Sequence, residues 1–279
     1  MNHILSFDIE AWYQGNFNNH DYRRYRGKVD DLVVPQTERL LDLLTETNNK
    51  ATFFILGDVA EDHPRLVKKI YLSGHEVATH FMHHDLVYTK SPQEFRSELR
   101  QSVDILEQLI GEKVLGFRAP SWSISLKQTP WFWEILIEEG LMYSSSRFPA
   151  KTYLYGDKTS PIFSHRIGTK SGDIWEIPPS CMQVFNLNIP FSGGVYFRVL
   201  PHWFIKLGIN WYERRENPAV LYLHPKEIDE KTPSLPISPV EKIIHKIGTK
   251  GCFPKLKKIL QHRHTISFKE WLISNRIIN

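Results

Sequence analysis

Short apolar runs that alternate with amphipathic segments are the feature that most limits the fold of this 279-residue chain. Apolar runs of four to eight residues predict buried strands, and apolar residues at intervals of three and four predict helices between them. The expected strands cover residues 4–10, 51–56, 75–79, 114–119, 142–143, 174–177 and 219–223. The expected helices begin at residues 35, 58, 91, 129 and 200, with one or two more after 238 and a closing strand and helix at 265–271. Strand–helix alternation is typical of a parallel sheet or barrel.

Nothing in the sequence separates these segments into two domains. We find no internal repeat and no low-complexity linker. An α/β barrel of this length is an ordinary single domain. We therefore predict one α/β domain that spans residues 1–279.

The composition argues against several classes of protein. Hydrophobic residues make up 41% of the chain and charged residues 24%, as in soluble globular proteins. The net charge of +4 is small and its basic residues are scattered, so we expect no nucleic-acid partner. Cys181 and Cys252 form neither a disulfide framework nor a metal-binding pair. The first residues lack the pattern of a signal peptide and no apolar run is long enough to cross a bilayer, so we expect a cytoplasmic protein without stable membrane insertion.

Chemically reactive side chains stand at the ends of four expected strands. They are Asp8 with Glu10, His80 with His84, Arg118, and His224. The carboxyl ends of parallel strands lie on one face of a sheet or barrel, where active sites are found. A helical turn after Thr79 would place His80 and His84 on one side, four residues apart. We therefore expect these residues to form one site.

The residue types in this set suit metal-assisted hydrolysis of an amide or an ester. A carboxylate with two histidines is a common site for Zn²⁺ or Fe²⁺ that leaves positions open. Asp8 and Glu10 lie two apart in a strand and face the same side, so one can bind metal while the other acts as a base. An arginine beside the base would hold it ionised, and a histidine could protonate the leaving group.

Seven motifs in order resemble the polysaccharide deacetylases, carbohydrate esterase family 4. They are Ser6–Glu10, Ala51–Gly57, Gly74–His84, Arg118–Ser121, Ile174–Pro178, Ser192–Arg198 and Tyr222–Pro225. The resemblance is strongest to the branch found in exopolysaccharide and lipopolysaccharide gene clusters. It implies a distorted (β/α) barrel with about seven parallel strands and one divalent metal ion, for which we expect Zn²⁺.

The resemblance also implies a role for each strand-end residue. Asp8 matches the catalytic base, Arg118 the partner of that base, and His224 the general acid. The metal ligands it implies are Glu10, His80 and His84. His83 matches a position that does not bind metal, although it lies next to the two histidine ligands, and His75 matches a structural position.

The chain departs from the common family pattern at two places. The usual first motif has adjacent aspartates, whereas Ile9 separates the two acids here and the second acid is Glu10. Many relatives carry an aspartate where this chain has Ser144. If that aspartate orients the catalytic histidine, its absence weakens the case for His224 as an acid.

Substrate contacts are expected from Trp122, Tyr196 and Trp12, with Gly193 and Gly194 shaping a wall. The expected activity is removal of an acetyl group, N-acetyl in the first place, from a sugar in surface polysaccharide synthesis. A nucleotide-linked or lipid-linked saccharide would be the substrate. Two alternatives remain open, namely a small-molecule amidase or deformylase with the same metal centre, and a carbohydrate-binding relative without catalytic activity.

Overall fold

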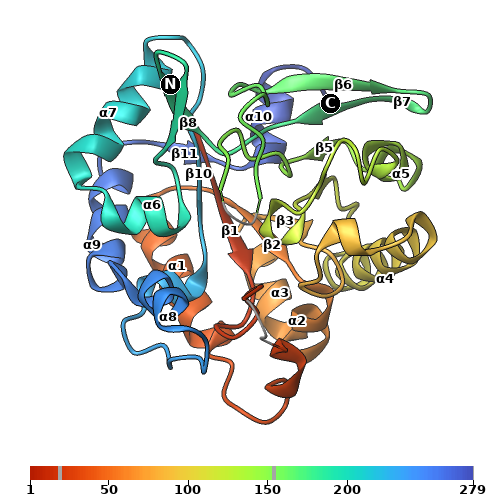
Figure 1. Ribbon diagram of the computed structural model, residues 1–279, viewed down its shortest axis with the longest axis horizontal. Coiled ribbons are helices and arrows are strands. Elements are labelled where there is room, and N and C mark those ends of the chain that lie inside the picture. The colour runs from red at the N-terminus through yellow and green to blue at the C-terminus, as the bar shows by residue number, and fades with distance from the viewer. Residues whose placement is uncertain (18–20, 153–154, 279) are drawn as a thin grey trace.

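A nine-stranded sheet organises the computed structural model, which describes residues 1–17, 21–152 and 155–278. The strands follow the order β10-β1-β2-β3-β4-β5-β7-β6, and β11 pairs with β1 (Figure 1). Their bounds are β1 (His3–Ile9), β2 (Thr52–Ile55), β3 (Glu76–Thr79), β4 (Gly116–Phe117), β5 (Tyr143–Ser144), β6 (His165–Thr169), β7 (Gly172–Glu176), β10 (Val220–Leu223) and β11 (Thr265–Ile266). A separate hairpin consists of β8 (Cys181–Val184) and β9 (Leu187–Pro190).

The sheet confirms the predicted α/β barrel-like fold. Within the described residues, all neighbouring strands from β10 through β1 to β7 pair in parallel, and β6 joins β7 in an antiparallel hairpin. The sheet curls but stays open as a half-barrel. Within the described residues no ladder joins its two ends, β10 and β6. Each expected strand corresponds to a strand of the sheet, whereas β6, β8 and β9 lay outside the prediction.

The helices cover the sheet on two sides (Figure 1). Their bounds are α1 (Val33–Glu46), α2 (Gly57–Asp62), α3 (Pro64–Leu72), α4 (Pro92–Ile110), α5 (Phe132–Glu138), α6 (Gly194–Val199), α7 (His202–Glu213), α8 (Pro239–Lys246), α9 (Thr249–Leu260) and α10 (Phe268–Ser274). Short 3₁₀ turns are η1 (Tyr22–Arg24), η2 (Val87–Thr89), η3 (Pro120–Trp122) and η4 (Pro225–Ile228). No helix in the described ranges is long and apolar enough to cross a membrane.

Local sequence signals explain where several helices begin and end. Ser91 and Glu94 form the predicted capping box of α4, and Gly111 ends that helix with a φ of 75°. The single helix expected after Asp58 is instead two, α2 and α3. His63 separates them with a φ of −130°, because Pro64 lacks an N–H and restricts the residue before it.

The helical turn considered after Thr79 does not form. Residues 80–86 contain no helix, and residues 82–84 form a bend. Phe81 takes a φ of 82°, and its ring is fully buried against Phe95 and Phe117. The hydroxyl of Thr79 accepts a hydrogen bond of 3.0 Å from the Phe81 N–H. Burial of this ring therefore decides the path of the chain between the two histidines.

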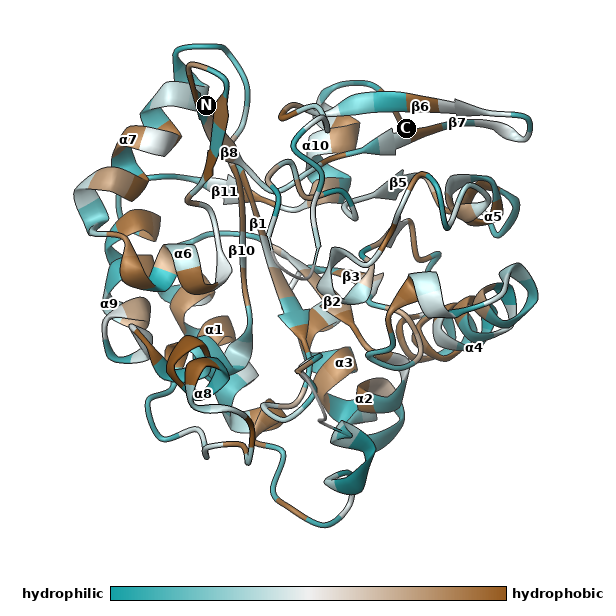
Figure 2. Ribbon diagram, in the orientation of Figure 1, coloured by the Kyte–Doolittle hydropathy of each residue, from teal (hydrophilic) through white to brown (hydrophobic). Residues whose placement is uncertain are grey.

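The interior is apolar along the strands and polar where they end. Every residue of β1, β2, β3 and β10 is buried. Figure 2 shows β1 as hydrophobic over much of its length and hydrophilic near its end. Because the carboxyl ends of these four strands lie in register, polar residues just beyond them are brought together.

Candidate active site

The strand-end residues predicted from the sequence line one cavity of about 340 Å³. The register explains this arrangement, because Phe7 pairs with Leu223, and Ile55 pairs with both Ile9 and Thr79. The cavity is lined in part by Asp8, Glu10, His80, His84 and His224. Arg118 lies directly behind it, fully buried.

Glu10, His80 and His84 form a cluster whose possible ligand atoms all lie within 4.8 Å of one another. All three residues are buried. Oε2 of Glu10 lies 2.7 Å from Nε2 of His84. This is the trio expected to hold a metal, and it forms without the helical turn.

His80 is held in the form that a metal requires. Its Nδ1 lies 2.8 Å from the carbonyl oxygen of Arg118, which can only accept, so Nδ1 carries the proton and Nε2 keeps its lone pair. Burial lowers the pKa of His80 to about 4, which keeps the ring neutral. Asn16 contacts Nδ1 of His84 at 3.2 Å and supports the second ring from behind.

Glu10 is ionised although it is buried. Burial acts to raise its pKa, but the charge of Lys226 and of the neighbouring histidines holds the pKa well below its usual range. Its Oε2 makes no hydrogen bond within the described structure, so only the close contact with His84 occupies that oxygen. One carboxylate oxygen and two imidazole nitrogens, converging and poorly satisfied among themselves, fit the donor set of Zn²⁺.

Asp8 is fixed by a buried arginine, as predicted. Its Oδ1 accepts a hydrogen bond of 2.6 Å from Nη1 of Arg118. The same guanidinium donates to the hydroxyls of Ser6 and Ser145, each at 2.9 Å, and stacks over the Phe54 ring at 4.2 Å. Oδ2 of Asp8 takes no part in this pairing and lies 3.7 Å from Nε2 of His224.

His224 has an acidic partner that the sequence analysis missed. Oε2 of Glu227 lies 3.0 Å from Nδ1 of His224 and accepts a second bond of 3.0 Å from the His224 N–H. Nε of Arg198 lies 2.9 Å from the other oxygen of Glu227. The signal was present as a capping-box spacing, an acid three residues after His224 across the turn η4.

The charges around His224 favour its protonated form. Burial acts to lower the pKa of His224, but Glu227, Glu10 and Asp8 together raise it. Burial likewise acts to raise the pKa of Glu227, yet His224 and Arg198 lower it to about 2. An ionised carboxylate therefore faces Nδ1, and Nε2 points its proton toward Asp8 and Glu10.

Ser144 does not contact His224. It is fully buried, and its hydroxyl donates to Ser146 at 2.9 Å. Glu227 therefore provides His224 with the acidic partner that seemed to be missing at residue 144.

Lys226 is a second residue that the sequence analysis missed. Its Nζ donates a bond of 2.6 Å to Oε1 of Glu10 and lines the cavity. His83, by contrast, lies outside the metal cluster, with Nδ1 3.6 Å from Oδ2 of Asp58. His75 is buried against the Phe53 ring.

The expected substrate contacts are only partly brought together. Trp122 and Tyr196 line the cavity, although Trp122 also packs against Tyr222 with ring centroids 4.6 Å apart. Trp12 does not line it, because its side chain folds inward and donates to the carbonyl of Asp30 at 2.9 Å. Gly194 forms part of the wall.

Gly193 is required by close packing behind this wall. A Cβ on Gly193 would lie 2.1 Å from the carbonyl oxygen of Tyr222. Only glycine allows this approach of the two backbones.

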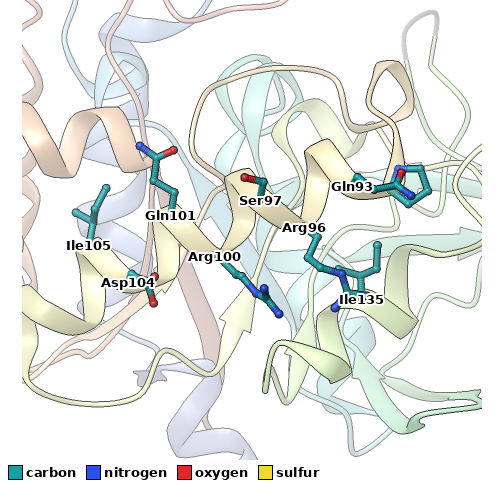
Figure 3. A pocket seen from close by; sticks show the side chains of 9 residues that line it. Gln93, Arg96, Ser97, Arg100, Gln101, Asp104, Ile105 and Ile135 are labelled. Atoms are coloured by element: carbon teal, nitrogen blue, oxygen red, sulfur yellow. The ribbon is translucent and has the colours of Figure 1, made fainter.

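A larger groove of about 630 Å³ along α4 has no comparable chemistry (Figure 3). Its basic side chains are Arg96 and Arg100. They form ion pairs with Glu138 and Glu139. No histidine lines it. The smaller cavity at the strand ends is therefore the candidate active site.

Comparisons with known proteins find similarity to deacetylases over part of this chain. Residues 28–129 match the family model described as polysaccharide deacetylase, and residues 145–272 match a domain of unknown function (DUF3473). A peptidoglycan-N-acetylglucosamine deacetylase of Bacillus cereus is 35% identical over 95 residues, which are 34% of this chain and 34% of that protein. A chitooligosaccharide deacetylase of Sinorhizobium fredii is 46% identical over 48 residues, 17% of this chain and 22% of that protein. The matched stretches thus span about a third of these curated relatives or less.

The fold extends the similarity over most of the chain. A crystal structure named as a probable polysaccharide deacetylase of Pseudomonas aeruginosa PAO1 aligns with a TM-score of 0.57 and 15% sequence identity. The alignment covers 94% of this chain and 86% of that chain. The family model and these relatives show similarity to polysaccharide deacetylases over part of the chain, and the crystal structure shows a shared fold.

Proposed function

We propose that the protein is a metal-dependent hydrolase that removes an acetyl group from a sugar, N-acetyl in the first place. The observation that carries the proposal is one cavity that combines the cluster of Glu10, His80 and His84 with the ionised pairs around Asp8 and His224. The activities named for the relatives, on N-acetylglucosamine and chitooligosaccharide, support this reaction class. A role in exopolysaccharide or lipopolysaccharide synthesis is proposed from the motif resemblance alone.

Glu10, His80 and His84 would hold one divalent ion, and their donor set favours Zn²⁺. Such an ion, when bound, acidifies water and polarises a carbonyl group. The protein prepares this site by keeping Glu10 ionised and His80 neutral.

Asp8 is the proposed base. Arg118 binds Oδ1 and fixes the plane of the carboxylate, so Oδ2 is left to take a proton from the attacking water. The buried serine hydroxyls on Arg118 hold the guanidinium in turn.

His224 is the proposed acid. Its Nε2 lies 3.7 Å from Asp8 Oδ2, so base and acid flank the same point in the cavity. Glu227 at Nδ1 favours the imidazolium, which can donate its Nε2 proton to the departing sugar nitrogen or oxygen. Tyr196 and Trp122 line the cavity and form walls against which a sugar ring can lie.

The test is acetate release from chitooligosaccharides and N-acetylated sugars, before and after metal removal by a chelator. We expect activity to disappear with the chelator and to return with Zn²⁺. Asp8→Asn is expected to abolish turnover while bound zinc stays near one per chain, and activity in this variant would exclude Asp8 as the base. Release of formate or acetate from small amides only, with none from sugars, would favour the amidase alternative.

A further inference from the structure

Helix α8 exposes two of its apolar residues, Val240 and Ile243, and buries its acid, and Ile247 directly after the helix is also exposed. Val240, Ile243 and Ile247 are 66%, 61% and 44% exposed, whereas Glu241 is only 6% exposed. Their spacing of three and four residues places these aliphatic side chains on one side of the segment. Surface helices normally turn such a row toward the core, so an outward row indicates a surface that meets an apolar partner.

The exposed apolar row continues on the neighbouring helices. Arg198 at the end of α6 donates to the carbonyl oxygens of Ile244, His245 and Ile247, so α6 and α8 are joined at this point. Beyond Arg198 come exposed apolar residues on α6 and α7. We call the combined set the apolar face, which consists of Val199, Trp203, Leu207, Val240, Ile243 and Ile247.

Helices α6, α7 and α8 lie along the same side of the molecule (Figure 1), and Figure 2 shows hydrophobic colour on the outer turns of α8. The helices that carry these exposed apolar residues therefore belong to one side of the molecule.

The apolar face stands among positive charges. Residues 194–213 and 239–260 contain eight lysines and arginines and two acids, Glu213 and the buried Glu241, although the whole chain has a net charge of only +4. Lys206, Lys242 and Lys250 are exposed between or beside the apolar residues. Apolar side chains bordered by lysines are typical of helices that lie in the interface of an anionic bilayer.

A second copy of the chain fits this face less well. A two-fold symmetric dimer would bring the same patch of each copy together, and therefore lysines against lysines. An anionic lipid surface instead complements the charge and accepts the aliphatic and indole side chains.

The apolar face also borders the candidate active site. Ile244 and His245 of α8, and Val195 and Tyr196 of α6, line the cavity. Contact of these helices with a membrane would therefore place the cavity beside the lipid headgroups.

We propose that the apolar face docks the protein on an anionic bilayer, with Val240, Ile243 and Trp203 entering the interface and the lysines contacting acidic headgroups. Binding is peripheral, because the described part of the chain contains no helix suited to cross a membrane. The proposal does not depend on the catalytic reaction, and it makes acetylated sugars carried on lipids accessible to the cavity.

The test is co-sedimentation of the full chain with vesicles of phosphatidylcholine alone or mixed with phosphatidylglycerol. We expect binding to the anionic vesicles only, weakened by high salt. The double variant Val240→Ser/Ile243→Ser should bind at least about tenfold more weakly. Lys242→Glu/Lys250→Glu should also bind more weakly and lose most of the salt dependence. Leu72→Ser on α3, where the leucine is 81% exposed, is the matched control and should bind as the parent does.

Several results would overturn the proposal. They are no vesicle binding, equal binding to neutral and anionic vesicles, or unchanged binding by Val240→Ser/Ile243→Ser. A dimer in solution that this double variant abolishes, without vesicle binding, would assign the face to self-association instead. Acetate release from soluble chitooligosaccharides should be the same in the double variant and the parent, so a failure of docking is distinct from a failure of the proposed reaction.

Discussion

Replacing Glu227 by glutamine tests whether the acid at Nδ1 makes His224 effective. The amide preserves the size of the side chain but removes the charge that faces the imidazole at 3.0 Å. Arg198 keeps three backbone carbonyl partners, so its guanidinium is not left without acceptors. The substitution therefore changes the charge on His224 more than the packing around it.

The size of the effect follows from the carboxylate's environment. The pKa of Glu227 is lowered from 4.5 to about 2, a difference equivalent to about 3 kcal/mol in favour of the ionised form. We expect kcat to fall by about 10²- to 10⁴-fold, the range seen when a histidine loses its orienting acid or its role in proton transfer. The free energy of unfolding should fall by only about 1–3 kcal/mol, the usual cost of a weakened buried hydrogen bond.

The assay measures kcat and KM for acetate release together with bound zinc per chain. A positioning role for Glu227 predicts a lower kcat, nearly unchanged KM and unchanged zinc, with partial recovery in Glu227→Asp. Glu270→Gln is the matched control, because Glu270 occupies the same place in the capping box of Ser267 on α10, far from the cavity in the chain's fold. If Glu227→Gln keeps the parent's kcat, or loses no more than Glu270→Gln does, Glu227 does not act through His224.

Three further changes test the charges of the fold and the site. Arg118→Leu leaves Asp8 buried and unpaired, so we expect the free energy of unfolding in urea to fall by about 3–5 kcal/mol, far more than for the exposed Arg100→Leu. Glu10→Gln removes the one anionic donor of the metal cluster, and we expect zinc affinity in a competition titration to fall at least about tenfold. The hydrogen bond from His63 to Asp31, at 2.6 Å, raises the pKa of His63 in the folded protein. The stability that this pair contributes is therefore complete below pH ~6 and is lost as the pH rises through the folded pKa of His63. His63→Gln should therefore reduce stability in urea at pH ~6 and make little difference at pH ~9.

Each of these expectations has a result that contradicts it. Equal losses in Arg118→Leu and Arg100→Leu would mean that the buried pair adds nothing beyond a surface pair. Unchanged zinc affinity in Glu10→Gln would place the metal elsewhere. A stability difference for His63→Gln that is independent of pH would show that the ring acts by packing.

The sequence predicts the site better than it predicts the path of the chain through the site. Glu10 and His80 could be predicted because each directly follows or ends a buried strand, and parallel strands in register bring their ends together. The helical turn considered between His80 and His84 does not form, because burial of Phe81 at a positive φ is a tertiary effect that residue spacing does not contain. The placement of Trp12 depended in the same way on a loop that folds inward to reach Asp30.

Glu227 and Lys226 were missed for a different reason. Each contacts a predicted residue only because the chain after His224 makes the tight turn η4, which returns the side chain of Glu227 to the ring of His224. In an extended segment an acid three residues later would face the opposite side. The capping-box spacing was the available signal, and a histidine is not among the usual residues at the start of such a box.

The buried charges of the site are arranged so that each acid has its own cation. Asp8 faces Arg118, Glu10 faces Lys226, and Glu227 faces both His224 and Arg198. Removing charges from water is costly unless they are paired, so each of the three buried carboxylates lies against a cationic partner. His80 differs from these charged residues. Burial keeps its ring neutral, and its Nδ1 faces a carbonyl oxygen rather than a charged partner. The charges of the proposed acid and of the metal cluster are coupled, because Glu10 helps to raise the pKa of His224 and His224 helps to lower the pKa of Glu10. A substitution at either residue is therefore expected to change the charge balance of the other.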